Sequence, residues 1–215
     1  MANCMLVFDI DGTLFDTKPG IFSALEDVFT RFDLGTFDRA HGMRYIGPPV
    51  KQSLMTFNGL SEETSEKATA YYREVYVNKY IALSSPYDGV FQMLANLKDA
   101  GHLLSIATMK TRKQVDKLLD ITGTDRNLFE FIETALENGK MSKEKMLENI
   151  SSNSDYPVVM IGDTEGDKKA ACMSKNGFVG VTYGYGFDRN SCFDFPVANS
   201  VTDLFDLIED YCSKY

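Results

Sequence analysis

Histidine is scarce in this sequence, which contains only His41 and His102. Two histidines cannot build a histidine-rich metal site, and a Ser–His–Asp triad would have to use His102. That residue follows Gly101 at a predicted helix-to-strand turn, where we expect a surface position without a catalytic role. The sequence therefore argues against chemistry based on histidine.

Cysteine is also scarce, and its four copies lie far apart, at Cys4, Cys172, Cys192 and Cys212. No two of them form a CxxC pair, and no spacing matches a zinc site. Disulfide frameworks are typical of smaller secreted domains, so we expect reduced cysteines and a reducing compartment.

Long apolar runs and an excess of basic residues are missing too. No stretch approaches the roughly 20 apolar residues that cross a bilayer, and Asp9 interrupts the N-terminal apolar run, which argues against a signal peptide. The 22 Lys and Arg are outnumbered by 31 Asp and Glu, for a net charge of −9. This charge argues against nucleic-acid binding but allows a small anionic substrate, because a site's local field can oppose the net charge. We expect a cytoplasmic protein that binds neither membranes nor nucleic acids.

The sequence does contain a series of short apolar runs rich in Val, Ile and Phe. They cover residues 5–8, 103–108, 129–134, 158–161 and 178–182. Continuous runs of this kind are typical of parallel strands that are covered on both faces. Helical spacing is found in residues 111–121, 142–150, 164–173 and 200–211. This alternation predicts an α/β fold with a doubly wound, Rossmann-like parallel sheet.

Residues 16–83 interrupt the alternation. Their pattern is helical, with Pro19, Gly47-Pro48-Pro49 and Gly59 as breaks. We predict a core made of residues 1–15 and 84–215, with an all-α domain of residues 16–83 inserted after the first strand. A chain of 215 residues that is 44% hydrophobic has enough apolar material for such a core.

The first strand ends in two acids, within the stretch MLVFDIDGTLFDT. Asp9 lies at the carboxyl end of the strand, where a doubly wound sheet forms its ligand crevice. Asp11 is close enough to repel Asp9 unless a cation or a shared proton intervenes, and such a pair suits Mg²⁺ binding, attack on phosphorus and proton transfer. Gly12 permits a tight turn, and Thr13 offers a hydroxyl and an N–H to an anion. The ordinary alternative is a polar turn with an Asx cap.

A second apolar run ends in acids, within VVMIGDTEGDKKAA. Asp163 lies at the strand end, and Asp167 follows four residues later on the same predicted helix face. Asp163 would join Asp9 around a metal ion, with Asp167 behind it. An ordinary helix N-terminus also favours acids, but two acid-tipped strands in one parallel sheet favour a joint site.

Two further elements are weaker. In LLSIATMKT a strand ends at Thr108, and Met109 leads into a predicted helix, so a hydroxyl and N–H groups could bind a phosphate oxygen. In ENGKMSKEKMLENI, Lys140, Lys143 or Lys145 could neutralise charge on a nucleophile and a phosphoryl group. Each of these residues, taken alone, is more often structural or solvated.

These four elements, in this order, resemble the motifs of the haloacid dehalogenase superfamily of phosphohydrolases, and the resemblance covers the full length of the chain. Residues 16–83 look like the small helical cap of that superfamily. YIGPPVKQSL in the insert and TYGYG after the last predicted strand suggest its phosphoglycolate phosphatase and 5′-nucleotidase-like branch.

The resemblance implies a role for each motif residue. Asp9 would be the nucleophile that forms an aspartyl-phosphate, and Asp11 would protonate the leaving group and then activate water. Asp9, the backbone carbonyl of Asp11 and Asp163 would bind Mg²⁺, while Asp167 would orient the cation from behind. Residues at the strand ends would hold the phosphoryl group together with a lysine: Thr13, Thr108 and Met109. An acid at position 11 disfavours dehalogenation and phosphonate cleavage, since those relatives lack it.

The lysine is chosen by comparison of two motif forms. Many relatives have Gly-Lys-Pro, from which Gly139-Lys140-Met141 departs. In the nucleotidase-like form the lysine lies three residues later, before an acid and an apolar pair, and the stretch from Lys143 to Leu147 fits that form. We therefore choose Lys143 over Lys140.

The expected function is Mg²⁺-dependent hydrolysis of a small phosphomonoester. A sugar-phosphate mutase would use the same aspartate, and a non-catalytic sensor of a phosphorylated metabolite would use the same pocket, although retention of every catalytic position argues against the sensor. Phosphoglycolate, nucleoside monophosphates, sugar phosphates and pyrophosphate all stay open as substrates, as does the oligomeric state. Since the motif residues handle only the phosphoryl group, we expect substrate choice in the cap, where Arg44 could fork to a carboxylate or hydroxyl or form a surface ion pair.

Overall fold

The computed structural model describes residues 3–136 and 141–214 of the chain. It contains two compact units: Met1–Asp16, Pro86–Thr111 and Asp125–Tyr215 form the first, and Thr17–Ser85 and Arg112–Thr124 form the second. Residues 112–124 belong to the second unit together with residues 17–85. The division into a core and an inserted domain at residues 16–83 stays a prediction.

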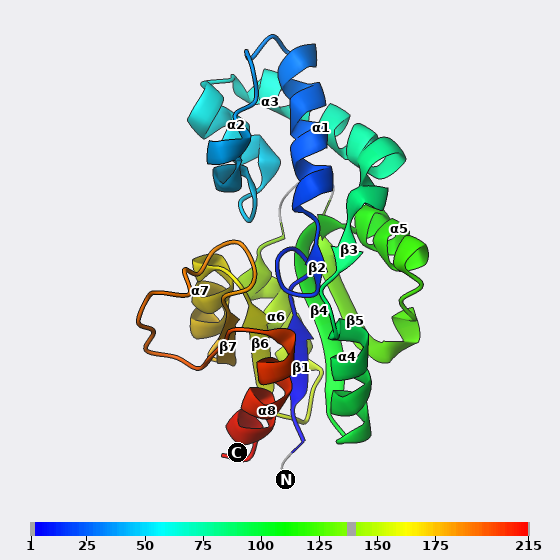
Figure 1. The fold of residues 1–215 in the computed structure, drawn as a ribbon, viewed down its shortest axis with the longest axis vertical. Coiled ribbons are helices and arrows are strands. Elements are labelled where there is room, and N and C mark those ends of the chain that lie inside the picture. The colour runs from blue at the N-terminus through cyan, green and yellow to red at the C-terminus, as the bar shows by residue number, and fades with distance from the viewer. Residues whose placement is uncertain (1–2, 137–140, 215) are drawn as a thin grey trace. The chain divides into compact units, whose positions relative to one another are not determined.

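The first unit contains a six-stranded parallel sheet with the order β5-β4-β1-β6-β7-β8 (Figure 1). Five strands correspond to the predicted apolar runs, and the sixth, β8, was not predicted because two residues carry no periodic signal. The strands are β1 (Met5–Phe8), β4 (Leu103–Thr111), β5 (Phe129–Ala135), β6 (Val158–Gly162), β7 (Gly177–Val181) and β8 (Val197–Ala198).

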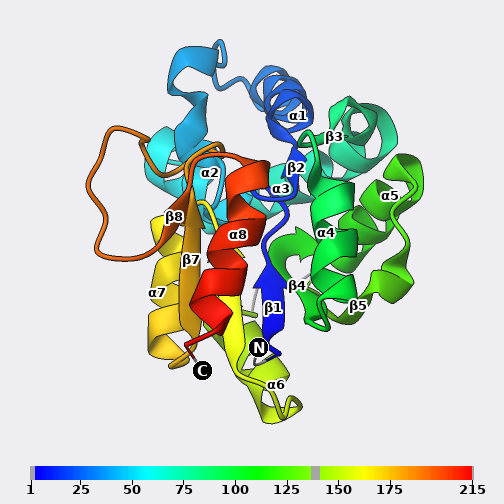
Figure 2. The same ribbon diagram turned by 60° about the horizontal axis from the view of Figure 1, so that its bottom comes forward.

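Helices cover both faces of this sheet, as Figure 2 shows. Helices α4 (Val90–Asp99) and α8 (Val201–Cys212) pack together on one face, and α6 (Lys143–Ser152) and α7 (Glu165–Met173) pack together on the other. A short 3₁₀ turn at Arg126–Leu128 precedes β5. The predicted doubly wound α/β fold is confirmed.

The strand order indicates which edge of the sheet can bind a ligand, and we call this edge, at the carboxyl ends of β1, β4 and β6, the functional edge. From β1 the chain adds β4 and β5 on one side and then β6, β7 and β8 on the other, so the order reverses at β1. Phe8, the last residue of β1, pairs with Ile106 of β4 and with Ile161 of β6. The residues that follow these three strands therefore meet at one edge, which is where doubly wound sheets bind ligands.

The end of β4 differs from the prediction. Met109, Lys110 and Thr111 were expected to lead into a helix, but they continue the strand, with an irregular pairing between Thr108 and Thr111. The Thr108 hydroxyl accepts a hydrogen bond from the Lys110 N–H at 3.3 Å, which satisfies a backbone donor at the irregularity. As a result the next helix, α5 (Arg112–Thr122), begins four residues beyond Thr108, and no helix N-terminus directly follows this threonine.

The second unit is built from helices. Its members are α1 (Lys18–Arg31), a 3₁₀ turn (Arg39–Tyr45), α2 (Val50–Asn58), α3 (Glu62–Val75), a π turn (Tyr76–Tyr80), a 3₁₀ turn (Ile81–Leu83) and α5. The two-residue strand β2 (Phe15–Asp16), which belongs to the first unit, pairs with β3 (Ser85–Pro86). No helix among residues 3–136 and 141–214 is long and apolar enough to cross a membrane.

Local sequence explains where these helices begin and end. Pro19 lies in the first turn of α1, where its missing N–H costs no hydrogen bond. Gly59 ends α2 with a φ of 66°, a conformation that glycine adopts without a Cβ clash. The Ser61 side chain accepts from the Thr64 N–H at the start of α3. Aromatic rings then hold the unit together, with Phe29 packed edge-on against Phe37 at 5.1 Å.

The expected surface position of His102 is wrong. Its side chain is only 2% exposed. Its ring nitrogens contact the Cys4 backbone N–H at 3.1 Å and the Glu209 carboxylate at 2.7 Å. A histidine at a helix-to-strand turn is buried here because both of its nitrogens have polar partners on neighbouring elements.

Candidate active site

Asp9 and Asp11 follow β1 at the functional edge of the sheet. The Asp9 N–H donates to the Ile161 carbonyl at 3.0 Å, which continues the ladder between β1 and β6 by one residue. The chain then turns, because the N–H groups of Leu14 and Phe15 donate back to the Ile10 carbonyl. Asp9 is 6% exposed. The turn thus holds one acid in a buried position and places the second acid close behind it in the chain.

Asp163 follows β6 at the same edge and is fully buried. Its Oδ2 accepts the Tyr185 N–H at 2.7 Å, and its Oδ1 accepts the Thr13 hydroxyl at 3.4 Å. Carboxylate oxygens of Asp9, Asp163 and Asp167 all lie within 4.8 Å of one another. Two acid-tipped strands therefore do meet at one edge, as the sequence indicated.

Asp167 has two functions in this structure. It forms a capping box with Thr164 at the start of α7: its Oδ2 accepts the Thr164 backbone N–H at 3.1 Å, and its own N–H donates to the Thr164 hydroxyl at 3.3 Å. The same Oδ2 also accepts the Thr164 hydroxyl at 2.6 Å. Its Oδ1 accepts a hydrogen bond from the Lys143 ammonium at 2.5 Å. Asp167 therefore caps the helix and also belongs to the charged site. Its Oδ2 caps α7, and its Oδ1 pairs with Lys143.

Two lysines face these acids: Lys110 is buried, and Lys143 is largely buried, with 12% of its side chain exposed. Lys143, the first residue of α6, lies 3.0 Å from Asp9 Oδ1 and 2.5 Å from Asp167 Oδ1. Lys110 lies 2.7 Å from Asp11 Oδ1, and its side chain is 5% exposed. Sequence reasoning missed Lys110. The signal that could have found it is its position two residues after Thr108, which places it at the same edge as Thr108 when the strand continues.

The pKa values of Asp9, Asp163 and Lys143 are all shifted, because these groups are buried close to other charges. Burial raises the pKa of Asp9 to about 7; Lys143 opposes this effect, and the charges of Asp167 and Asp11 add to it. Burial also raises the pKa of Asp163 well above its usual range, with further contributions from Asp167 and Asp9. Burial by itself disfavours the charge on Lys143, yet the neighbouring carboxylates raise the pKa of this lysine. The local field of the site is therefore negative.

The donor set fits a divalent cation. Four carboxylates at Asp9, Asp11, Asp163 and Asp167 face two ammonium groups, which leaves two negative charges if all are ionised. Asp9 Oδ1 is buried without a hydrogen-bond partner of acceptable geometry, although the Lys143 ammonium lies within ion-pair distance. Oxygen ligands and an uncompensated negative charge are what Mg²⁺ requires of a protein site.

The other predicted site residues lie as follows. Thr13 and Thr108 are fully buried, and Met109 packs partly buried against the core. Arg44 lies in the second unit, where its guanidinium stacks over the rings of Tyr45 at 5.3 Å and Phe57 at 5.0 Å. Lys140, the alternative to Lys143, lies outside the described residues.

The TYGYG loop after β7 packs against the segment that carries the acids, and its Tyr185 N–H donates to Asp163. The Tyr183 hydroxyl donates to the Thr13 carbonyl at 3.1 Å, and the Tyr185 hydroxyl donates to Asp16 Oδ1 at 2.6 Å. A Cβ on Gly184 would lie 2.2 Å from the Gly12 carbonyl oxygen and 2.5 Å from Asp163 Cβ. Only glycine lets the loop approach this closely.

This close packing yields a test on stability. Gly184→Ala should destabilise the protein by about 1–3 kcal/mol, because the new methyl group overlaps a backbone atom that cannot move away. Gly166→Ala is the matched control, since the nearest atom to its Cβ would be Thr164 Oγ1 at 3.4 Å. Urea unfolding measures both variants. Equal midpoints for the two would show that the loop yields to the extra methyl group.

Comparisons with known proteins find similar sequences and structures among hydrolases and phosphatases. A family model described as "Haloacid dehalogenase-like hydrolase" matches residues 6–181. A 5′-nucleotidase of Pseudomonas aeruginosa is 28% identical over 185 residues, which cover 85% of this chain and 83% of that protein. The pyrophosphatase PpaX of Halalkalibacterium halodurans is 30% identical over 212 residues, covering 94% and 95% of the two chains. A crystal structure described as a predicted phosphatase from Clostridium acetobutylicum is 30% identical, with a TM-score of 0.88, and the match covers 98% of this chain and 100% of that one.

Proposed function

The chain belongs to the haloacid dehalogenase-like hydrolase family and is a phosphoric monoester hydrolase, and we propose that it removes phosphate from a small metabolite through an aspartyl-phosphate on Asp9. The observation that carries the proposal is the meeting of Asp9, Asp163, Asp167 and Lys143 at one edge of the sheet. Asp9 lies at a strand end between the Lys143 ammonium and the carboxylates of Asp163 and Asp167. A carboxylate in this position is suited to nucleophilic attack on phosphorus.

Each residue of the site has a proposed task. Asp9 attacks the phosphorus atom, and Lys143, 3.0 Å from Asp9, neutralises charge on the nucleophile and on the phosphoryl oxygens. Asp11 donates a proton to the leaving oxygen and later takes one from the attacking water. Thr13, Thr108 and Met109 stay proposed contacts of the phosphoryl group.

The proposed cofactor is Mg²⁺, held by Asp9, Asp11 and Asp163, with Asp167 behind them. Bound there, the ion would favour the ionised form of Asp9 and attract the phosphoryl oxygens. The buried acids need such a partner, because burial and mutual repulsion raise the pKa of Asp9 and Asp163.

Binding of Mg²⁺ should be visible in thermal melts. At a concentration about 100-fold above its Kd the ion adds about 2.7 kcal/mol, which corresponds to a rise of about 5–10 °C in Tm for a chain of this size. Asp163→Asn should lose this rise, whereas Asp206→Asn, an exposed acid of α8, should keep it. A rise of the same size in both variants would place the ion elsewhere.

The pH dependence of the melting temperature provides a second test of the same site. Without Mg²⁺, Asp9 keeps its proton in the folded state up to about pH 7 but loses it near pH 4 in the unfolded state. The stability of the metal-free protein should therefore fall as pH rises through this window. The ion competes with that proton, so the rise in Tm on adding Mg²⁺ should be larger at pH 8 than at pH 5.5. A rise that is independent of pH would contradict the direction of the Asp9 shift.

The substrate class is a small phosphorylated metabolite, and a panel assay tests it. Phosphate release with Mg²⁺ should be measured on phosphoglycolate, nucleoside monophosphates, sugar phosphates and pyrophosphate. Release to water supports the phosphatase, whereas isomerisation of a sugar phosphate without net release supports a mutase. No release on any member, with an intact fold, would favour a phosphometabolite sensor.

Arg44 is the proposed specificity residue. Arg44→Ala should raise KM most for substrates with a second anionic group, because a guanidinium can bind a carboxylate or phosphate with two hydrogen bonds, and it should leave turnover of a small aryl phosphate nearly unchanged. Arg31→Ala is the matched control, since Arg31 also lies against a ring of the second unit, 6.0 Å from the Phe32 centroid. A uniform change over all substrates would remove Arg44 from substrate choice.

A further inference from the structure

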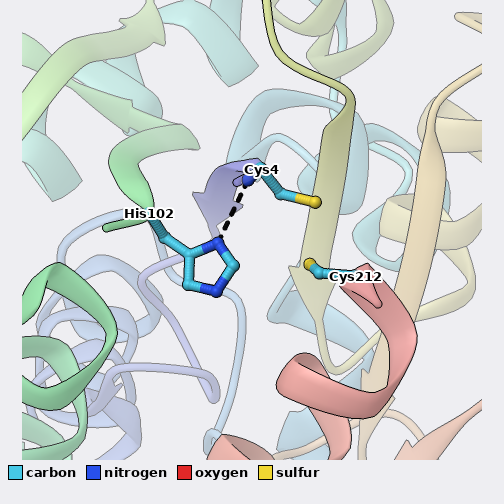
Figure 3. Close-up of side chains that lie close together, drawn as sticks. All are labelled: Cys4, His102 and Cys212. Carbon is cyan, nitrogen blue, oxygen red and sulfur yellow. Dashed lines mark hydrogen bonds between the residues drawn. The ribbon is translucent and has the colours of Figure 1, made fainter. Parts of the chain in front are cut away.

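A second cluster of reactive side chains lies at the opposite edge of the sheet. It contains Cys4, which precedes β1, His102, which precedes β4, and Cys212, the last residue of α8. All three are at most 2% exposed. Ligand-type atoms of the three lie within 4.8 Å of one another, and Figure 3 shows the two sulfur atoms side by side next to the imidazole ring. The whole of β1 separates this cluster from Asp9, a distance of roughly 17 Å along the strand.

The imidazole of this cluster is already committed. The Cys4 N–H donates to His102 Nδ1 at 3.1 Å, so Nδ1 carries a lone pair and the proton of the neutral ring is on Nε2. Nε2 then donates to the Glu209 carboxylate at 2.7 Å. A metal ion on either nitrogen would have to displace one of these hydrogen bonds. The two thiols are therefore the members of the cluster that are available for chemistry.

We propose that Cys4 and Cys212 form a reversible disulfide that joins the segment before β1 to the end of α8. The oxidant is a small-molecule disulfide. The Cys212 thiolate attacks one of its sulfur atoms and releases one thiol, which leaves a mixed disulfide on Cys212. The Cys4 thiolate then attacks Cys212 Sγ and releases the second thiol. Two protein thiols are oxidised and one small disulfide is reduced to two thiols.

The position of Cys212 provides access. Both cysteines are free thiols, and both are buried. Because Cys212 ends a helix, fraying of the last turn exposes it without unfolding the sheet. While both thiols are reduced and the helix is intact, the contact between them lowers the pKa of Cys4, and the same contact and burial raise the pKa of Cys212. Cys212 therefore becomes the attacking thiolate only when the last turn of α8 frays and this contact breaks. The exposed thiols of Cys172 and Cys192 should react with the oxidant first.

The proposed disulfide would act on stability and leave the catalytic edge unchanged. It closes a loop between residues near the two ends of the described chain, so it restricts the unfolded state strongly. Neither cysteine contacts an acid or lysine of the candidate active site. Oxidation should therefore raise Tm by about 5 °C or more, while kcat on an aryl phosphate should change by less than about twofold, since β1 and the acids stay in place.

The experiment uses the full chain with Cys172→Ser and Cys192→Ser, so that Cys4 and Cys212 are its only thiols. The reduced protein is incubated with oxidised glutathione, and a non-reducing digest is mapped by mass spectrometry. We expect a peptide pair linked through Cys4 and Cys212, the rise in Tm given above, and reversal of both by dithiothreitol. Adding Cys212→Ser should abolish the linked pair and the rise in Tm.

Three results would overturn the proposal. The first is that both thiols stay open to alkylation after prolonged oxidation at a temperature where the last turn of α8 frays. The second is a stable glutathione adduct on Cys212 that Cys4 does not resolve. The third is retention of one equivalent of Zn²⁺ by the reduced protein, with both thiols protected from alkylation and with loss of the ion in His102→Gln; this would make the cluster a metal site.

Discussion

Asp9→Asn should remove turnover of every phosphomonoester, by a factor on the order of 10⁴ or more, while the protein stays folded. The substitution keeps the shape of the side chain but removes the nucleophilic oxygen and one charge next to Lys143. Initial rates with a sensitive aryl phosphate, at saturating Mg²⁺, measure the loss. Brief reaction of the unmodified enzyme followed by acid quench and peptide mapping should place a phosphoryl group on Asp9.

The stability of the same variant separates a chemical loss from unfolding. Burial raises the pKa of Asp9, so its charged form is unfavourable in the metal-free protein at pH 8, and a neutral amide removes that penalty. Metal-free Asp9→Asn should therefore melt no lower than the unmodified protein at pH 8, even though Lys143 loses one partner. Activity near the unmodified level, or a phosphoryl group mapped to another residue, would end the assignment of Asp9 as nucleophile.

Asp11→Asn should cut turnover by about 10²–10⁴-fold, which is the usual contribution of a general acid–base group. The loss should depend on the leaving group. Alkyl phosphates leave as poorly stabilised alkoxides and need the proton of Asp11, whereas aryl phosphates leave without one. We therefore expect a large loss for an alkyl ester and a small loss for a nitrophenyl ester, measured as kcat/KM on both. Equal losses on the two esters would argue that Asp11 acts only through the metal ion or the fold.

Lys110 provides a second variant for the same question. Its ammonium lies 2.7 Å from Asp11 Oδ1, so we expect it to position that carboxylate. Lys110→Met keeps the length of the buried side chain and should lower turnover less than Asp11→Asn, again mostly for alkyl esters. In the Asp11→Asn background the same change should have little further effect, because coupled residues are not additive. Full additivity of the two losses would show that Lys110 acts independently of Asp11.

Much of the fold is predictable from local pattern. Each of the longer strands coincides with an apolar run, because a strand covered on both faces has to be apolar throughout. The last strand of the sheet, β8, which pairs with β7, was not predicted because it has only two residues. The end of β4 was misplaced because the irregular pairing between Thr108 and Thr111 depends on β5, which the local sequence of β4 does not contain.

The sequence by itself determined the parallel sheet, the acid-tipped ends of β1 and β6, and the family resemblance, because these depend on residues close together in the chain. Tertiary structure alone decided which groups meet. It placed Lys110 against Asp11, gave Asp167 both a capping role and an ion pair, and buried His102. It also brought Cys4 and Cys212 together, although no spacing in the sequence relates them. Such pairs arise because parallel strands align their ends in space regardless of the length of chain between them, and because the connecting helices begin or end beside those strand ends. The groups that meet at either edge of the sheet are therefore set by strand order and by helix placement.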